Sequence, residues 1–69
     1  MVEALVTPKL ITWARERNNL TVDTAARKIN VSVERFNAWE RGDTRPTLRQ
    51  AQTLAHRLYV PFGYLFLSD

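Results

Sequence analysis

The chain has 69 residues, a net charge of +3 and a sequence pI near 10.0. A chain of this length makes one small domain, whose core supplies about 3–5 kcal/mol of net stability. It contains no cysteine, which excludes disulfides and thiolate metal sites, and His56 is its single histidine, so we expect neither a metal nor a cofactor.

No apolar run approaches the roughly 20 residues of a membrane span, and the first ten residues lack the order of charged and apolar regions of a signal peptide. We therefore expect a cytoplasmic protein with no membrane partner. The acidic residues show no paired arrangement suited to acid–base catalysis, so we expect no enzyme. The modest positive charge permits a nucleic-acid partner without requiring one.

The first predicted helix covers residues 8–19. Thr7 is its expected N-cap and Pro8 occupies its first position, where the missing N–H of proline costs nothing. Asn18 and Asn19 end it. Along one side it places Leu10, Trp13, Ala14 and Arg17.

The second and third predicted helices follow closely. Thr21 caps the second helix, and Asn30 can take the left-handed conformation that ends it. Ser32 caps the third, which Gly42 ends. The apolar stripe of the second helix is Val22, Ala25, Ala26 and Ile29, and the inward side of the third is Val33, Phe36 and Trp39.

Two more helices complete an all-α fold of five short helices. Thr47 and Gln50 form a capping box that starts the fourth helix, and Pro61 starts the fifth. The fourth is expected to bury Leu48, Ala51, Leu54, Ala55 and Leu58. The fifth is expected to bury Phe62, Leu65 and Phe66, which leaves Tyr64 and Leu67 pointing away from the core as a candidate interface.

The connection between the second and third helices is the informative feature. Only Asn30 and Val31 separate Ile29 from the cap Ser32, so the chain must turn sharply between two short helices. Such a turn is typical of the helix-turn-helix. A generic small helical bundle fits the pattern equally well.

The segment "LTVDTAARKINVSVERFNAWERGDTRPTLRQAQTLAHRLYVP" resembles the Xre-type, phage-repressor-like (Cro-like) helix-turn-helix domain. Its most specific pieces are "WERG", followed three residues later by proline, and the preceding "AARKI". The resemblance implies a lambda-repressor-like fold with the helix-turn-helix at helices two and three. We assign residues 7–67 to this domain and residues 1–6 to an N-terminal tail.

The resemblance also implies double-stranded DNA as the partner, with the third helix in the major groove. Positions implied for base contacts are Val33, Glu34, Arg35, Asn37 and Ala38. Positions implied for phosphate contacts are Thr21, Ser32, Arg41, Thr44, Arg45 and Thr47. The chain carries Val22 and Val33 where well-known repressors often carry glutamine, and a merely solvated polar face is the alternative interpretation of Arg35, Asn37 and Arg41.

Two further features follow from resemblance. An arginine of the first helix pairs with the glutamate that ends the third in similar repressors, which corresponds to Arg15 and Glu40. "LYVPFGYLFLSD" is similar to the segment that precedes the linker in proteins with a C-terminal ImmA/IrrE-type metallopeptidase domain. Residues 68–69 would then begin a linker to a missing C-terminal domain; the alternative is a complete small regulator.

Two classes of function remain open. The first is a sequence-specific transcriptional regulator, alone or as the DNA-binding head of a longer toxin–antitoxin or stress-response protein. The second is a protein-interaction module of the same fold with weak or no base-specific DNA binding. In either case we expect a homodimer, or docking of the missing C-terminal domain, through Tyr64 and Leu67.

Overall fold

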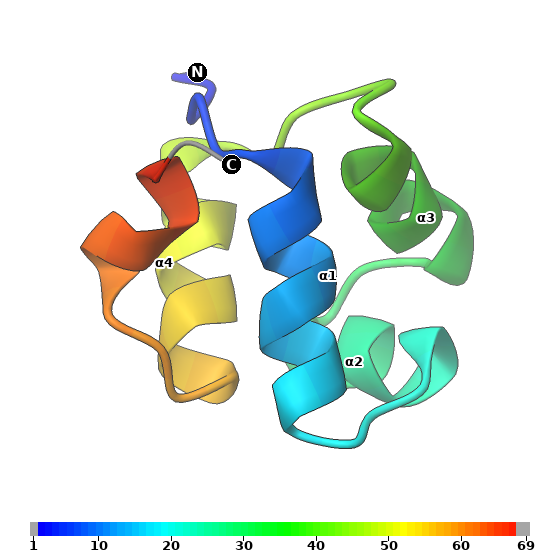
Figure 1. The fold of residues 1–69 in the computed structure, drawn as a ribbon. Coiled ribbons are helices and arrows are strands. Elements are labelled where there is room, and N and C mark those ends of the chain that lie inside the picture. The colour runs from blue at the N-terminus through cyan, green and yellow to red at the C-terminus, as the bar shows by residue number, and fades with distance from the viewer. Residues whose placement is uncertain (1, 68–69) are drawn as a thin grey trace.

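The computed structural model describes residues 2–67, which form four α-helices and one 3-10 helix (Figure 1). In chain order they are α1 (Pro8–Arg17), α2 (Val22–Ile29), α3 (Val33–Arg41), α4 (Leu48–Arg57) and η1 (Phe62–Phe66). The all-α fold is confirmed, but the structure has four α-helices where the sequence predicts five.

The last element is a 3-10 helix of five residues rather than an α-helix. The amide of Tyr64 donates to the carbonyl of Pro61 at 3.0 Å, and that of Leu67 donates to Tyr64 at 3.2 Å. These are the i to i+3 bonds of a tighter helix, which is used in short pieces. Gly63 lies inside the segment and disfavours a regular α-helix.

The helix α1 packs against α3 and η1, while α2 packs against α3 and α4, and α4 against η1. In Figure 1, α4 and η1 lie to the left of α1, and α2 and α3 to its right. The core is continuous between the two sides. Its largest fully buried side chains are Trp39, Phe36, Ile11, Leu54, Leu58, Leu65 and Pro46.

The turn between α2 and α3 is fixed by its two ends. Asn30 has φ = 65° and ends α2 in the left-handed conformation, while the Ser32 hydroxyl accepts a hydrogen bond from the amide of Arg35 at 3.1 Å. Gly42 ends α3 at φ = 81°, where a Cβ would also lie 3.3 Å from Cγ of Pro8. The sharp turn and both helix ends are therefore as the sequence predicts.

Thr7 precedes α1 but does not cap it with its side chain. Its hydroxyl instead donates to the carbonyl of Leu67 at 2.7 Å, and its amide donates to the carbonyl of Leu65 at 2.8 Å. The start of α1 is thereby joined to η1, an arrangement that local capping patterns do not indicate.

Residues 2–6, which fall in the N-terminal tail expected over residues 1–6, pack onto the helices. Ala4 and Val6 are buried. The amide of Ala4 donates to the carbonyl of Pro46 at 2.9 Å, and the amide of Leu48 donates to the carbonyl of Val2 at 2.8 Å. We call residues 2–6 the N-terminal strap, because they clamp the chain where it enters α4.

Two side chains predicted in the core lie at the surface. Leu48 is 40% exposed because it occupies the first position of α4, at the edge of the core. Phe66 is 39% exposed because the threefold period of η1 aligns Phe62 with Leu65 and turns Phe66 outward. The rings of Phe62 and Phe66 meet edge to face, with 5.0 Å between their centroids.

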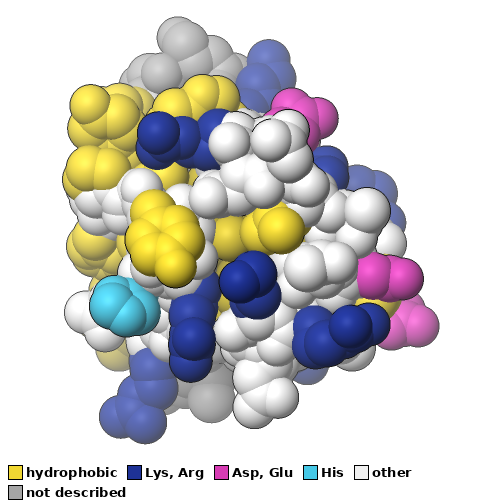
Figure 2. Space-filling view, turned by 90° about the horizontal axis from the view of Figure 1, so that it is seen from below, with side chains coloured by type: hydrophobic (Ala, Val, Ile, Leu, Met, Phe, Trp, Pro, Cys, Tyr) yellow, Lys and Arg dark blue, Asp and Glu magenta, His cyan; other side chains and the backbone are white. Residues whose placement is uncertain are grey.

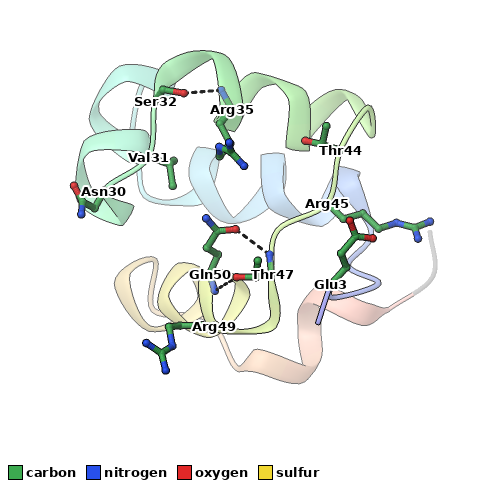
Figure 3. A pocket seen from close by; sticks show the side chains of 10 residues that line it. All are labelled: Glu3, Asn30, Val31, Ser32, Arg35, Thr44, Arg45, Thr47, Arg49 and Gln50. Carbon is green, nitrogen blue, oxygen red and sulfur yellow. Dashed lines mark hydrogen bonds between the residues drawn. The ribbon is translucent and has the colours of Figure 1, made fainter. Parts of the chain in front are cut away.

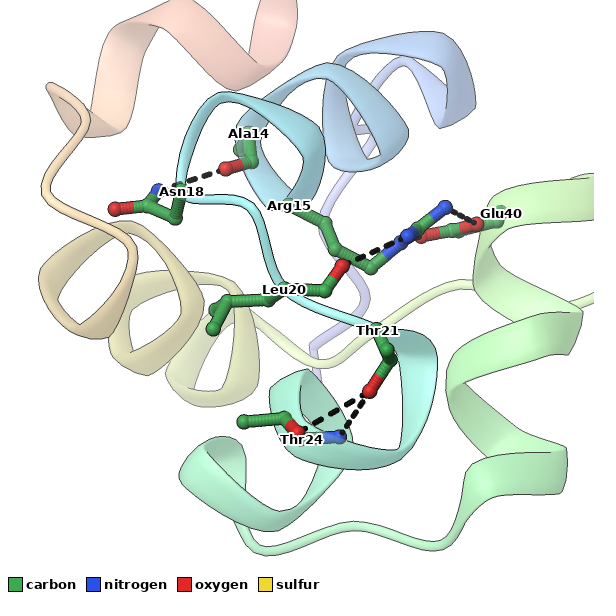
Figure 4. A network of polar contacts seen from close by, with 7 residues as sticks. All are labelled: Ala14, Arg15, Asn18, Leu20, Thr21, Thr24 and Glu40. Atoms are coloured by element: carbon green, nitrogen blue, oxygen red, sulfur yellow. Dashed lines mark hydrogen bonds and ion pairs between the residues drawn. The ribbon is translucent and has the colours of Figure 1, made fainter.

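Arg15 forms a salt bridge with Glu40 and also binds the loop before α2 (Figure 4). Its Nε and Nη2 donate to the two carboxylate oxygens at 2.7 and 3.3 Å, and its Nη1 donates to the carbonyl of Leu20 at 2.9 Å. The side chains are only 16% and 12% exposed. The hydrogen bond to Glu40 raises the pKa of Arg15 above its ordinary value.

We expect Glu40→Ala to lower the free energy of unfolding by about 2–4 kcal/mol, between the limits for exposed and buried pairs. The variant leaves a shielded guanidinium without its carboxylate. The raised folded-state pKa of Arg15 contributes stability at pH values below its ordinary pKa, as long as the Glu40 carboxylate is ionised. The deficit of the variant should therefore be present throughout the neutral range.

Urea denaturation checks this, with Asp43→Ala as the control. Asp43 is the partner of Arg41 in a pair whose side chains are 60% and 61% exposed, so its loss should cost less than about 1 kcal/mol. Equal losses in the two variants would show that Arg15 and Glu40 do not hold the fold together.

Candidate nucleic-acid interface

A wide groove of about 820 Å³ lies where the N-terminal ends of α3 and α4 face each other (Figure 3). We call it the α3–α4 groove. Five of the residues lining it were predicted as DNA contacts: Ser32, Arg35, Thr44, Arg45 and Thr47. The other five were not: Glu3, Asn30, Val31, Arg49 and Gln50.

The groove is positively charged, because Arg35, Arg45 and Arg49 oppose a single carboxylate, that of Glu3. Within the part of the chain that the structure describes, none of these three arginines has an ion-pair partner, whereas Arg15 and Arg41 are paired. Figure 3 shows Arg35 pointing from α3 toward α4. The groove therefore offers three guanidinium groups available to an anion.

Helix N-termini add backbone donors to the same surface. At α3 the hydroxyl of Ser32 satisfies the amide of Arg35, and among residues 2–67 the amides of Val33 and Glu34 have no partner. Such amides at a positive helix end are suited to phosphate or carboxylate oxygens.

The start of α4 is almost fully satisfied within the chain. Thr47 accepts from the amide of Gln50 at 3.1 Å, and the side chain of Gln50 accepts from the amide of Thr47 at 2.9 Å. The amide of Leu48 is bound by the N-terminal strap. The capping box predicted from sequence is thus present, and it fixes Arg49 and Gln50 at the floor of the groove.

The five positions implied for base contacts differ in their surroundings. Glu34 and Arg35 are exposed, and with Ala38 they line a smaller hollow beside Ser32 and Thr44. Asn37 is partly buried. Val33 packs against the core and lines a separate hollow facing α2.

Two of the positions implied for phosphate contacts lie outside the α3–α4 groove. The Thr21 hydroxyl caps α2, accepting from the amide of Thr24 at 3.2 Å (Figure 4). Arg41 donates through Nε to Asp43 at 2.8 Å. Their contacts with DNA stay predictions.

Sequence reasoning missed five groove residues: Glu3, Asn30, Val31, Arg49 and Gln50. One signal was available for Arg49, which is the second residue of α4, where the helix dipole disfavours a cation. The presence of Arg49 at this position therefore indicates a role other than stabilising α4. No local signal marks Glu3, because it reaches the groove through a bridge to Thr47.

A second surface surrounds η1. Tyr64, Phe66 and Leu67 are 47%, 39% and 50% exposed, and the ring of Tyr64 stacks on Trp13 with 6.1 Å between centroids. Arg17 covers the Trp13 ring at 5.1 Å. We call Trp13, Tyr64, Phe66 and Leu67 the η1 patch. Figure 2, seen from below, shows hydrophobic side chains along the left edge, the side on which η1 lies in Figure 1.

Among the described residues, no group of three or more histidine, aspartate and glutamate side chains is placed to hold a metal ion. No helix there is long and apolar enough to cross a membrane. Residues 68–69, assigned to a linker, lie outside the described residues.

Four α-helices, with the second and third joined by Asn30, Val31 and Ser32, define a helix-turn-helix domain. The family model described as "Helix-turn-helix" (HTH_3) matches residues 11–65, so the chain belongs to this family. Among solved structures it is similar to the P22 c2 repressor in complex with synthetic operator 9T. That similarity has a TM-score of 0.83 and 21% identity, and it covers 96% of this chain and 100% of the repressor chain. No curated protein sequence matches the chain.

We expect Thr47→Val to lower the free energy of unfolding by about 1 kcal/mol, because it removes the hydroxyl that caps α4 while keeping the shape of the side chain. Thr44→Val is the matched control. Thr44 is exposed in the same loop and forms no hydrogen bond with another described side chain, so its loss should stay within about 0.5 kcal/mol. Thermal unfolding measures both, and an equal shift in the two variants would contradict a specific role of the cap.

Proposed function

We propose that the chain is a sequence-specific DNA-binding transcriptional regulator that inserts α3 into the major groove. The observation that carries the proposal is the α3–α4 groove. It lies at the N-terminal end of α3 and is lined by three arginines that have no ion-pair partner among the described residues. The family supports it, as does the similarity of the fold to a repressor whose structure contains operator DNA.

In this proposal the backbone of one DNA strand lies along the α3–α4 groove. Arg45, Arg49 and the free amides at the start of α3 bind phosphates and set the register of the domain, while Arg35 and Glu34 face base edges. A guanidinium can bind guanine O6 and N7 together, and a carboxylate can accept from cytosine N4. Asn37 completes the set with a contact to adenine. The chain's role in this proposal is binding, with no catalytic step.

Two variants separate the proposed roles. Arg49→Ala should weaken binding to every duplex alike and reduce the slope of log affinity against log salt by about one. Arg35→Ala should cost about 1–3 kcal/mol and relax the preference at one base pair of a selected site.

Fluorescence anisotropy with random and selected duplexes measures both effects. Arg57→Ala is the control, because it removes the same charge from the exposed end of α4 that lies outside the groove. If all three variants bind as the wild type does, the groove is not the DNA-binding surface.

We further propose that the chain acts as a homodimer through the η1 patch. One domain of this size makes a limited contact, and repressors of this class bind paired half-sites about 34 Å apart. Exposed aromatic and aliphatic side chains at η1 supply a candidate surface for that pairing.

Sedimentation equilibrium tests the dimer. The wild type should self-associate at high micromolar concentration, and the double variant Tyr64→Ser with Leu67→Ser should be monomeric, because it removes apolar area from the patch. A wild type that stays monomeric at every concentration would contradict the dimer. The η1 patch would then be proposed to bind another domain, first of all a C-terminal domain of a longer toxin–antitoxin or stress-response regulator.

The exposed η1 patch also favours a second candidate, a protein-interaction module of the same fold without base readout. A measurement of DNA binding distinguishes the two functions. A domain that binds a partner through the η1 patch but shows neither salt-dependent DNA binding nor loss on Arg49→Ala would be such a module.

A further inference from the structure

The N-terminal strap places a carboxylate in the cationic groove. The strap is held on both sides of Glu3, by the bond from the Leu48 amide to the Val2 carbonyl and the bond from the Ala4 amide to the Pro46 carbonyl. Glu3 itself forms an antiparallel bridge with Thr47. The backbone position of Glu3 is therefore fixed relative to the start of α4.

The direction of the Glu3 side chain follows from this pairing. Successive side chains of an extended segment point to opposite sides, and Ala4 points into the core. Glu3 consequently points outward, where it lines both the α3–α4 groove and an adjoining hollow beside Gly42, Asp43 and Arg45 (Figure 3).

The carboxylate of Glu3 lies near Arg45 in both hollows without forming a salt bridge to it. It forms no ion pair with another described residue, and the nearby Asp43 is engaged by Arg41. Among the described residues that line the groove, Glu3 supplies the one carboxylate, and it shares the adjoining hollow with Arg45.

We propose that Glu3 is a negative determinant of DNA binding, whose carboxylate, held by the strap, repels phosphates at the Arg45 end of the groove. The proposal rests on the proposed DNA-binding function. Repulsion between like charges a few ångströms apart weakens binding to all duplexes and is screened by salt. Phosphate contacts are thereby concentrated on Arg49 and the free amides at the start of α3.

The test is Glu3→Gln, which keeps the shape of the side chain and the backbone pairing of the strap. Against a short random-sequence duplex, this variant should bind on the order of fivefold more tightly than the wild type at low salt. The gain should shrink as salt is raised, and the thermal unfolding midpoint should not change.

Glu16→Gln is the matched control. It changes the net charge by the same amount on an exposed residue of α1 outside the groove, so its gain should be much smaller. The double variant Glu3→Gln with Arg45→Ala tests whether Glu3 acts on phosphates near Arg45. The gain from Glu3→Gln should fall when Arg45 no longer holds a phosphate near it.

The outcomes separate this inference from the function on which it rests. Equal gains from Glu3→Gln and Glu16→Gln, or a gain that salt does not reduce, would overturn the role of Glu3 while leaving DNA binding intact. A wild type and variants that all fail to bind the duplex, with the fold intact, would overturn both.

Discussion

The guanidinium of Arg15 holds three segments of the chain in one place. Through Glu40 it ties the end of α3 to α1, and through the carbonyl of Leu20 it fixes the loop that leads into α2. The angle between α2 and α3 is set by their own short turn, and this side chain adds a polar tie to the buried apolar contacts that place them against α1. A bidentate arginine suits the task, because its planar donors allow a single geometry.

Much of this arrangement can be read from the sequence, since local chemistry determines it. The residues Thr21, Ser32 and Thr47 cap their helices, while Asn30 and Gly42 adopt the left-handed conformation that ends α2 and α3. In each case the signal and its effect lie within one helical turn. The helix-turn-helix follows from these caps together with the apolar spacing.

The parts that could not be predicted depend on contacts between distant residues. Thr7 has a typical capping residue type, yet its hydroxyl binds Leu67, and nothing near Thr7 in the sequence indicates that partner. The N-terminal strap pairs with residues 46–48, and this pairing places Ala4 in the core and Glu3 at the groove. The same reason explains why Glu3 was missed and why only part of the α3–α4 groove was found. Phe66 is exposed and not buried because η1 has the period of a 3-10 helix, whereas the sequence pattern predicts an α-helical period.

The bonds between Thr7 and the segment 65–67 also bear on the order in which the molecule assembles. The hydrogen bond from Thr7 to Leu67 joins residues 60 positions apart and closes a loop of nearly the whole chain. Closing this loop costs conformational entropy, which the contact offsets only once it has formed. The helices and the α2–α3 turn rely on short-range contacts, which form quickly. The strap, Thr7 and η1 should thus join the helices late in folding. Two surfaces far apart in the sequence, the groove wall at Glu3 and the η1 patch, would then be completed only after the helix-turn-helix has formed.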